Sequence, residues 1–301
     1  MIAGLVLAMG LTVAQHDSGV VTTPDGVKLY YERVGSGMPV VIVPGRFLVA
    51  RDFGRLAHGR TLVFYDMRNR GRSSAVADTA AISIRRDVED LETIRRHVGA
   101  ERVSLIGFSY LGYMVMLYTM AHPDRVDRVV QLGPVPWHFD ATYPDSLTAV
   151  RHPAHPAPAD TLKLHAWADS GYETSRPREY CAVAWAVDRV GLVGDPVNVP
   201  KLGVGWCDMP NEWPVNSDRH LKYHIATIAK LTTSASDVAA IHVPVLTIHG
   251  TWDRNAPYGS GVEWARTLPH ARLIPVSGAG HFSWLDAPNV VFPAIDRFLS
   301  Q

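Results

Sequence analysis

The sequence predicts an α/β fold in which a mostly parallel central sheet carries helices on both faces. Three observations support this prediction. Short apolar runs alternate with helical patterns on both sides of a long irregular middle segment. The chain has 301 residues, of which 47 % are hydrophobic, so it can bury one large core. Polar motifs directly follow the apolar runs, at the strand ends where parallel sheets bind their ligands.

The first half of the chain contains a series of predicted strands. A partly alternating run follows the turn at residues 24–26, and three apolar runs and one further predicted strand come after it. The predicted strands are residues 27–34, 39–43, 61–65, 103–107 and 126–132. Apolar residues also recur at steps of three and four from Ile84 to Val98, with charged residues between them, which predicts an amphipathic helix. A further helical stretch covers residues 113–118.

The alternation stops after Pro134 and resumes near Val243. The segment between them is rich in Trp and Pro and has broken helical patterns. In the last part of the chain, strands are expected at residues 243–250 and 271–276, and helices at 261–268 and 289–299. The polar residues that follow these late strands therefore belong to the same sheet edge as those of the first half.

The N-terminus indicates an export signal. Residues 2–13 are almost wholly apolar, and a polar stretch follows. This run is shorter than the ~20 residues that span a bilayer, so no stable membrane anchor is expected. No Lys or Arg precedes it, so a leader or strand of a cytosolic enzyme is the alternative. We predict a leader at residues 1–19 and a secreted or periplasmic protein, with a cytoplasmic location as the alternative.

The two cysteines bear on the compartment. Cys181 and Cys207 lack the spacing of a metal-binding pair. In an exported protein they would be able to form a disulfide, whereas in the cytosol two buried thiols are the default. The sequence leaves both possibilities open.

Charge and motifs exclude several classes of partner. Lys plus Arg and Asp plus Glu both number 29, so no basic excess points to nucleic acid, and a small molecule or short peptide is the expected substrate. No Gly-rich phosphate loop is present, and no cofactor is expected. His220 and His224 stand four residues apart, but no Glu follows the first His as in the zinc-protease motif, so we expect a helix face and no metal. The oligomeric state is not predicted.

Ser109 has the setting of a nucleophile. An apolar run ends at Gly107, Ser109 comes two residues later, and a helical stretch starts at once. This is the layout of a nucleophile elbow, in which a sharp turn between strand and helix presents the hydroxyl above the sheet. The pattern departs from G-x-S-x-G because Leu111 occupies the second Gly position and Gly112 follows it. We expect a displaced helix or a local pocket for the Leu111 side chain.

Two further residues complete a candidate triad. A Ser hydroxyl needs a His to take its proton and an acid to orient that His. Asp253 follows the 243–250 strand and His281 follows the 271–276 strand, which is the chain order Ser, acid, His of elbow-bearing hydrolases. Asp140 is the rival acid, but it lies in the irregular segment. Each residue alone has a structural alternative, namely a helix cap, a turn or a buried His.

The oxyanion hole is predicted from two backbone N–H groups. One belongs to Tyr110, directly after the nucleophile. The second follows the turn Pro44-Gly45, where Arg46 is the first choice and Phe47 the next.

These motifs resemble those of the α/β-hydrolase superfamily. The resemblance covers residues 20–301 apart from the middle segment. Its motifs are Pro44-Gly45, residues 66–73 (DMRNRGRS), residues 107–110 (GFSY), residues 250–253 (GTWD) and residues 280–282 (GHF). Within the superfamily the chain is most similar to the prolyl-aminopeptidase-like group. Pro44 departs from the His usual before Gly45, and Asn69 stands where relatives often have Gly, which Asn can replace at positive φ.

The resemblance implies a helical cap. It divides the chain into an α/β-hydrolase core at residues 20–136 and 237–301 and a cap at residues 137–236. Relatives in the group hold the free α-amino group of the substrate with cap carboxylates, for which Glu173, Glu179 and Glu212 are candidates. Glu179 also has Arg176 and Arg178 nearby for a solvated charge cluster. The candidate substrate contacts are Phe47, Glu179, Glu212, Trp137 and Trp185, although most aromatic residues of the cap are expected to pack it on the core.

The sequence therefore predicts a serine hydrolase with the triad Ser109, Asp253 and His281. The scissile bond is an ester or an N-terminal amide, because the triad chemistry does not choose between them. Alternatives are a carboxylesterase on small acyl esters, a cofactor-free perhydrolase or lyase on the same triad, and a ligand-binding protein that has lost the chemistry.

Overall fold

The computed structural model describes residues 16–138, 140–149, 157–167, 170–202, 207 and 213–301. Eight strands form one sheet in the order β1-β2-β4-β3-β5-β6-β7-β8. Strand β2 pairs antiparallel with both of its neighbours, β1 and β4. All the other neighbouring strands in this order are parallel. The strands are β1 (His16–Thr22), β2 (Lys28–Gly35), β3 (Val40–Pro44), β4 (Thr61–Tyr65), β5 (Val103–Phe108), β6 (Val126–Leu132), β7 (Val245–Gly250) and β8 (Ala271–Val276).

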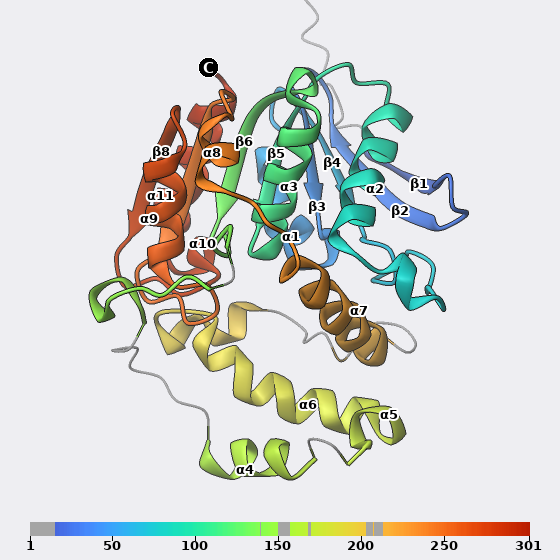
Figure 1. Cartoon of the computed structure of the whole chain (residues 1–301), viewed down its shortest axis with the longest axis vertical. Coiled ribbons are helices and arrows are strands. Elements are labelled where there is room, and N and C mark those ends of the chain that lie inside the picture. The colour runs from blue at the N-terminus through green and yellow to red at the C-terminus, as the bar shows by residue number, and fades with distance from the viewer. Residues whose placement is uncertain (1–15, 139, 150–156, 168–169, 203–206, 208–212) are drawn as a thin grey trace, which may run out of the picture.

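Helices cover both faces of this sheet (Figure 1). One face packs against α1 (Arg46–Phe53), α10 (Ser283–Asp286) and α11 (Pro288–Leu299). The other face packs against α2 (Ile84–His97), α3 (Tyr110–Ala121), α8 (Ala235–Ala239) and α9 (Tyr258–Thr267). The central strand β5 is buried along its whole length, as the continuous apolar run predicts. The predicted α/β architecture is thus confirmed.

The predicted elements agree closely with the observed ones. The predicted strands at residues 61–65, 126–132 and 271–276 have the observed bounds. The amphipathic helix predicted from Ile84 is α2, which begins there because Ser83 caps it by accepting a hydrogen bond from the N–H of Arg86. One strand was missed. β1 begins at His16, inside the expected leader of residues 1–19, and it pairs with β2 from His16 onward.

The segment between β6 and β7 forms helices at the carboxyl edge of the sheet. They are α4 (Pro158–Trp167), α5 (Tyr172–Ser175), α6 (Pro177–Asp188) and α7 (Trp213–Ile228). Figure 1 shows these four helices grouped beyond the strand ends, where α3 begins. We call residues 137–236 the cap. A disulfide joins Cys181 of α6 to Cys207, so these two cysteines are paired.

The base of the cap is tied to the core by hydrogen bonds. The Asp286 carboxylate accepts hydrogen bonds from the N–H of Gly194 (2.8 Å) and from the side-chain amide of Asn198 (2.7 Å). The N–H of Phe282 donates to the carbonyl of Leu192 at 2.8 Å. Within the described residues, no helix is long and apolar enough to cross a membrane.

Candidate active site

Ser109 is the single residue between β5 and α3, and its backbone conformation is strained. Its φ is 58° and its ψ is −128°. Non-glycine residues rarely adopt positive φ, and holding one there costs on the order of 1–3 kcal/mol, so such residues cluster at functional sites. The N–H of Ser109 donates to the carbonyl of Leu132 at 2.9 Å, which fixes the turn to the end of β6. This is the geometry that a nucleophile elbow requires.

Glycines allow the chain to turn this sharply. A Cβ at Gly107 would lie 2.4 Å from the carbonyl oxygen of Leu111, so any side chain there would clash with the first turn of α3. The expected pocket for the Leu111 side chain is also present. Leu111 is buried, and its Cδ1 lies 2.6 Å from the position that a Cβ of Gly45 would occupy. The missing side chain of Gly45 therefore makes room for Leu111.

Asp253 and His281 form a buried pair at the neighbouring strand ends. The Nδ1–H of His281 donates to Asp253 Oδ2 at 2.7 Å. The other carboxylate oxygen of Asp253 accepts from the N–H groups of Asn255 (2.9 Å) and Ala256 (2.8 Å). Both oxygens of the carboxylate are thus engaged, and this holds the carboxylate in one orientation behind the imidazole.

The imidazole of His281 also contacts the segment that precedes Ser109. The ring centroids of His281 and Phe108 are 4.6 Å apart. Gly133, which follows β6 with a φ of 48°, lies between these strand ends. A Cβ on Gly133 would come within 2.9 Å of Asp253 Oδ2 and 3.2 Å of His281 Nδ1. Only a glycine leaves space for the Asp253–His281 pair directly beside the end of β5.

A second histidine, which sequence reasoning missed, stands behind the pair. His249 is the penultimate residue of β7 and is fully buried. Its Nε2–H donates to the carbonyl of Ala256 at 2.9 Å and lies 3.2 Å from Asp253 Oδ2. The only signal for it was a His four residues before Asp253, inside an apolar strand.

Electrostatics keep the Asp253 carboxyl ionised. Burial raises its pKa, but the charge of His281 and the hydrogen bonds of His249 and His281 outweigh burial and hold the pKa well below its usual range. A permanently charged carboxylate behind an imidazole stabilises the imidazolium that forms when the imidazole accepts a proton. The rival acid Asp140 is exposed and contacts His138 instead, at 2.8 Å.

The predicted oxyanion donors lie at the starts of two helices. Arg46 is the first residue of α1, after Gly45 with a φ of 75°, and Tyr110 is the first residue of α3. The first N–H groups of a helix have no partner within it and favour negative charge. The contact between Gly45 and Leu111 brings these two helix starts together. The backbone of Phe47 is instead a hydrogen-bond partner of the Asp66 carboxylate, which favours Arg46 as the donor.

Side chains around Arg46 hold the first of these helix starts in place. The Arg46 guanidinium contacts Asp66 at 3.2 Å and Glu32 at 3.1 Å. Asp66 also accepts from the N–H of Arg72 at 2.9 Å, which ties the 66–73 segment to the same carboxylate. Asn69 in that segment has a φ of 62°, the conformation that Gly would adopt there.

The candidate substrate contacts of the cap differ in their placement. Trp137 and Trp185 are half-buried and pack against the two faces of the core. The indole N–H of Trp137 is buried without a hydrogen-bond partner among the described residues, so it stays a candidate donor to substrate. Glu179 is exposed and binds Arg176 (3.0 Å) and the hydroxyl of Tyr172 (2.7 Å), which is the solvated cluster that the sequence allowed. Glu212 lies outside the described residues.

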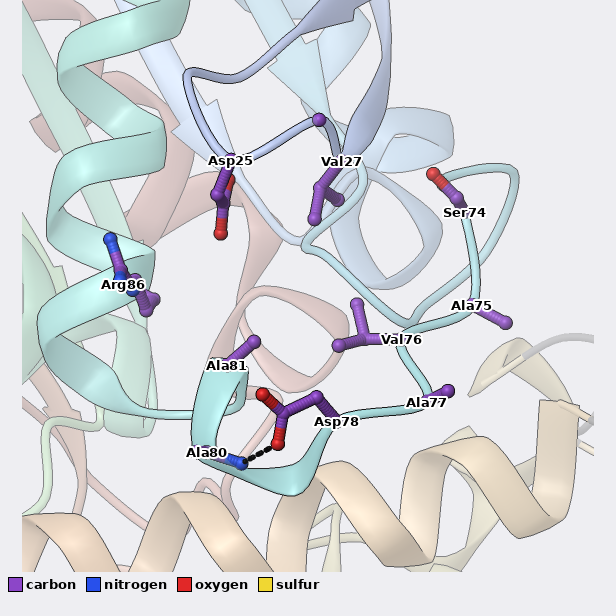
Figure 2. A pocket seen from close by; sticks show the side chains of 11 residues that line it. Asp25, Val27, Ser74, Ala75, Val76, Ala77, Asp78, Ala80, Ala81 and Arg86 are labelled. Atoms are coloured by element: carbon purple, nitrogen blue, oxygen red, sulfur yellow. Dashed lines mark hydrogen bonds between the residues drawn. The ribbon is translucent and has the colours of Figure 1, made fainter.

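A surface pocket lies elsewhere on the core (Figure 2). It is bounded by the turn between β1 and β2, by residues 74–81 and by Arg86 of α2. Figure 2 shows that small side chains line much of it, and that Asp78 accepts a hydrogen bond from the N–H of Ala80 within its own loop. None of the triad candidates lines this pocket.

Known proteins support this view of the fold. The family described as alpha/beta hydrolase fold matches residues 39–157. The chain is 24 % identical to a probable proline iminopeptidase of Leptolyngbya boryana, over 96 % of both chains. It is 26 % identical to a non-heme chloroperoxidase of Streptomyces lividans, over 94 % of this chain and all of that protein. An esterase from Exiguobacterium antarcticum superposes with a TM-score of 0.69 at 18 % identity, over 94 % of this chain and 99 % of that chain.

An esterase from Thermogutta terrifontis superposes with a TM-score of 0.67 at 20 % identity, over 95 % of this chain and 98 % of that one. At such identities the structural likeness concerns the fold. The chain has the α/β-hydrolase fold, as the motifs predicted. It is a hydrolase, and the proteins that it resembles over its length include a proline iminopeptidase and esterases.

Proposed function

We propose that this chain is a serine hydrolase that cleaves an ester or an N-terminal amide bond through an acyl-enzyme. Ser109 is the nucleophile, His281 the general base and acid, and Asp253 the residue that orients His281. The observation that carries the proposal is the strained turn at Ser109 next to the 2.7 Å pair of Asp253 and His281. Acyl transfer explains both features, because it needs an exposed serine on a sharp turn and a carboxylate–imidazole pair that takes the proton of that serine.

The first half of the reaction acylates Ser109. His281 takes the hydroxyl proton as Ser109 Oγ attacks the carbonyl carbon, and the N–H groups of Tyr110 and Arg46 bind the resulting oxyanion. Asp253 accepts the Nδ1–H of His281, so Nε2 is the free base of the imidazole. The imidazolium then returns its proton to the departing alcohol or amine as the carbon–oxygen or carbon–nitrogen bond breaks.

The second half releases the acid. His281 removes a proton from water, the hydroxide attacks the acyl carbon, and Ser109 leaves with the proton from His281. The products are a carboxylic acid and the alcohol or amine of the first step. The chain needs no group beyond its own residues for either half.

An activity-based probe tests the nucleophile. A fluorophosphonate should label the protein, and Ser109→Ala should remove the label. Ser104→Ala serves as the matched control, because Ser104 is a buried serine in β5, the strand that precedes Ser109, and this variant should keep the label. A folded wild-type protein that is not labelled would remove the triad from the proposal.

A substrate panel separates the two kinds of bond. It compares p-nitrophenyl esters of several acyl lengths with the p-nitroanilides of proline and alanine. The similarity to a probable proline iminopeptidase supports an N-terminal substrate, in which case turnover requires a free α-amino group. Turnover of the esters alone would establish the carboxylesterase alternative.

A peroxide-dependent activity is a second candidate. Two of the relatives are named non-heme chloroperoxidase and non-heme haloperoxidase. On the same triad, hydrogen peroxide would replace water in the second half-reaction, so a peracid leaves Ser109 in place of the acid. Halide oxidation that depends on acetate, peroxide and Ser109 would establish it.

We also propose that the protein is exported, that residues 137–236 form the cap, and that the core begins at β1 and comprises the rest of the sheet and its helices. The disulfide between Cys181 and Cys207 supports an oxidising compartment, where such bonds persist. N-terminal sequencing of the protein from a native host fraction tests whether residues before β1 are removed. Recovery from the cytoplasm with an intact N-terminus would contradict export.

A further inference from the structure

A buried cluster of two histidines and one aspartate joins the cap to the core. Asp87 lies on α2 of the core, and His220 and His224 lie one turn apart on α7 of the cap. All three side chains are fully buried. His224 Nε2 is 2.9 Å from Asp87 Oδ2, and His220 Nε2 is 3.6 Å from the same oxygen. One ligand atom from each residue lies within 4.8 Å of the other two.

The polar atoms of this cluster have no hydrogen-bond partners among the described residues. Both oxygens of Asp87 and all four ring nitrogens of His220 and His224 are in this position. The 2.9 Å contact between His224 and Asp87 has the length of a hydrogen bond without its direction. Each buried polar atom without a hydrogen-bond partner lowers the stability of the fold by about 1–3 kcal/mol. Six such atoms in one cluster indicate that a ligand binds between them.

The set of donors is suited to one kind of occupant. Two imidazole nitrogens and one carboxylate oxygen are the ligands that Zn²⁺ and related divalent ions take in proteins. Bonds of about 2.0–2.2 Å to a tetrahedral ion place its ligands about 3.4 Å from each other. The observed separations of 2.9 and 3.6 Å lie on either side of that value. We propose that Asp87, His220 and His224 bind a divalent transition-metal ion of the zinc class.

The site would clamp the cap where it adjoins the active site. Thr227 on the same helix accepts a hydrogen bond from the N–H of Ile84, the first residue of α2, at 3.1 Å, so α7 already docks on this part of the core. The rings of His224 and Tyr110 are 4.5 Å apart, edge to face. The ion thus holds α7 against the residue that follows Ser109. Arg70, whose guanidinium is 3.3 Å from the Tyr110 hydroxyl, is the cation that opposes binding.

This proposal differs from the expectation that His220 and His224 form only a helix face. Two His residues four apart are weak evidence of a metal site, and the third donor lies 133 positions before His220. Only the docking of α7 on α2 brings Asp87 to them. The site is independent of the proposed hydrolysis, because none of its residues belongs to the triad.

Metal binding to the purified, full-length protein tests the proposal. The protein is treated with chelator, then titrated with Co²⁺, whose visible absorption reports a tetrahedral site, and the bound zinc of untreated protein is measured by elemental analysis. We expect one equivalent of either metal and a higher thermal unfolding temperature with metal than without. A wild-type protein that binds no stoichiometric metal would overturn the proposal, and this measurement does not depend on any variant.

Variants assign the site. Asp87→Asn preserves the shape of the side chain and His224→Gln preserves part of its volume, and each should weaken Co²⁺ binding at least ~10-fold. The matched control is His242→Ala, which disrupts an exposed pair, His242 and His270, with ring centroids 5.9 Å apart. Circular dichroism checks that each variant is folded. Equal metal binding by Asp87→Asn, His224→Gln and the control would place the metal elsewhere and refute the assignment.

Discussion

The carboxyl edge of the sheet and the cap are built in opposite ways. At the sheet edge, Ser109, Asp253 and His281 are held by strands and helices with continuous buried cores on both faces. In the cap, the described parts of α4, α5 and α6 contain no buried residues. A disulfide between Cys181 and Cys207 links two parts of the cap to each other, and the cap contacts the core through hydrogen bonds at its base and a few buried residues such as Leu192, Val193 and Ile228.

This difference suits the sheet edge to catalysis and the cap to the selection of substrates. The reacting groups need fixed geometry, which close packing provides, because a packed core does not deform continuously. Helices with few buried residues keep more conformational freedom, so α4, α5 and α6 are able to adapt their contacts to a substrate. We therefore expect changes at the sheet edge to alter rate and stability strongly, and changes in the cap to alter local order first.

The largest effect is expected at Ser109. Ser109→Ala should lower kcat by roughly 10⁶-fold, because removing the nucleophile of a triad removes covalent catalysis altogether. Thermal unfolding should change little or shift upward, because Ala loses no packing there. Steady-state kinetics on the best substrate of the panel measures the rate. A variant that keeps more than a hundredth of the wild-type activity would show that another group is the nucleophile.

The next effect is expected at the acid. Asp253→Asn should lower kcat by roughly 10⁴-fold, because an amide leaves the His281 imidazole in the wrong tautomer and without its counter-charge. Asp140→Asn is the matched control, since Asp140 is exposed and bonded to His138. Activity lost in the control and kept in Asp253→Asn would transfer the role to Asp140.

The packing at the elbow gives a stability effect. Leu111→Ala should lower the free energy of unfolding by about 2–5 kcal/mol, because Leu111 is 1 % exposed and fills the space beside Gly45. Leu117→Ala on the same helix is partly buried and should cost less. Chemical denaturation followed by circular dichroism measures both. Equal costs would mean that the space beside Gly45 closes when Leu111 is truncated.

Removal of the disulfide tests how far it restrains the cap. Replacing Cys181 and Cys207 together by Ser opens a loop of 26 positions, whose closure is worth about 3 kcal/mol. We expect faster proteolysis within the cap and little change in the core, measured by limited digestion and mass spectrometry. Reductant should reproduce this result in the wild type and have no further effect on the double variant. Digestion of the core at the same rate would show that cap and core unfold together.

The smallest effect concerns an ion pair within the core. Hydrogen bonds from Arg95 and Tyr118 lower the pKa of Glu92 to about 2, although burial opposes them. The folded pKa lies below the unfolded value of 4.5, so the stabilisation is complete above about pH 5 and disappears as the pH falls to 2. Glu92→Gln should therefore cost about 1 kcal/mol at pH 7 and almost nothing near pH 2. A cost that is constant down to pH 2 would contradict this origin.

Much of the core was predictable from local patterns. Strand β5, the turn at Ser109 and helix α2 follow from apolar runs, a Gly-x-Ser step and a capped helical period, all of which are local in sequence. The grouping of Ser109, Asp253 and His281 could also be predicted, because the carboxyl ends of parallel strands lie at one edge of the sheet. The strand β1 was missed because the apolar residues before it suggested a leader, and a strand is defined by its partner as much as by its own residues.

The sequence by itself determined the fold class and the three residues proposed for catalysis, because strand ends and turns follow from short stretches of chain. Only the tertiary structure showed how Gly45 makes room for Leu111, how His249 stands behind Asp253, and how α7 brings two histidines to Asp87. Each of these contacts joins residues whose meeting depends on how elements pack. Packing is decided by the shapes of whole faces, and no short motif encodes it.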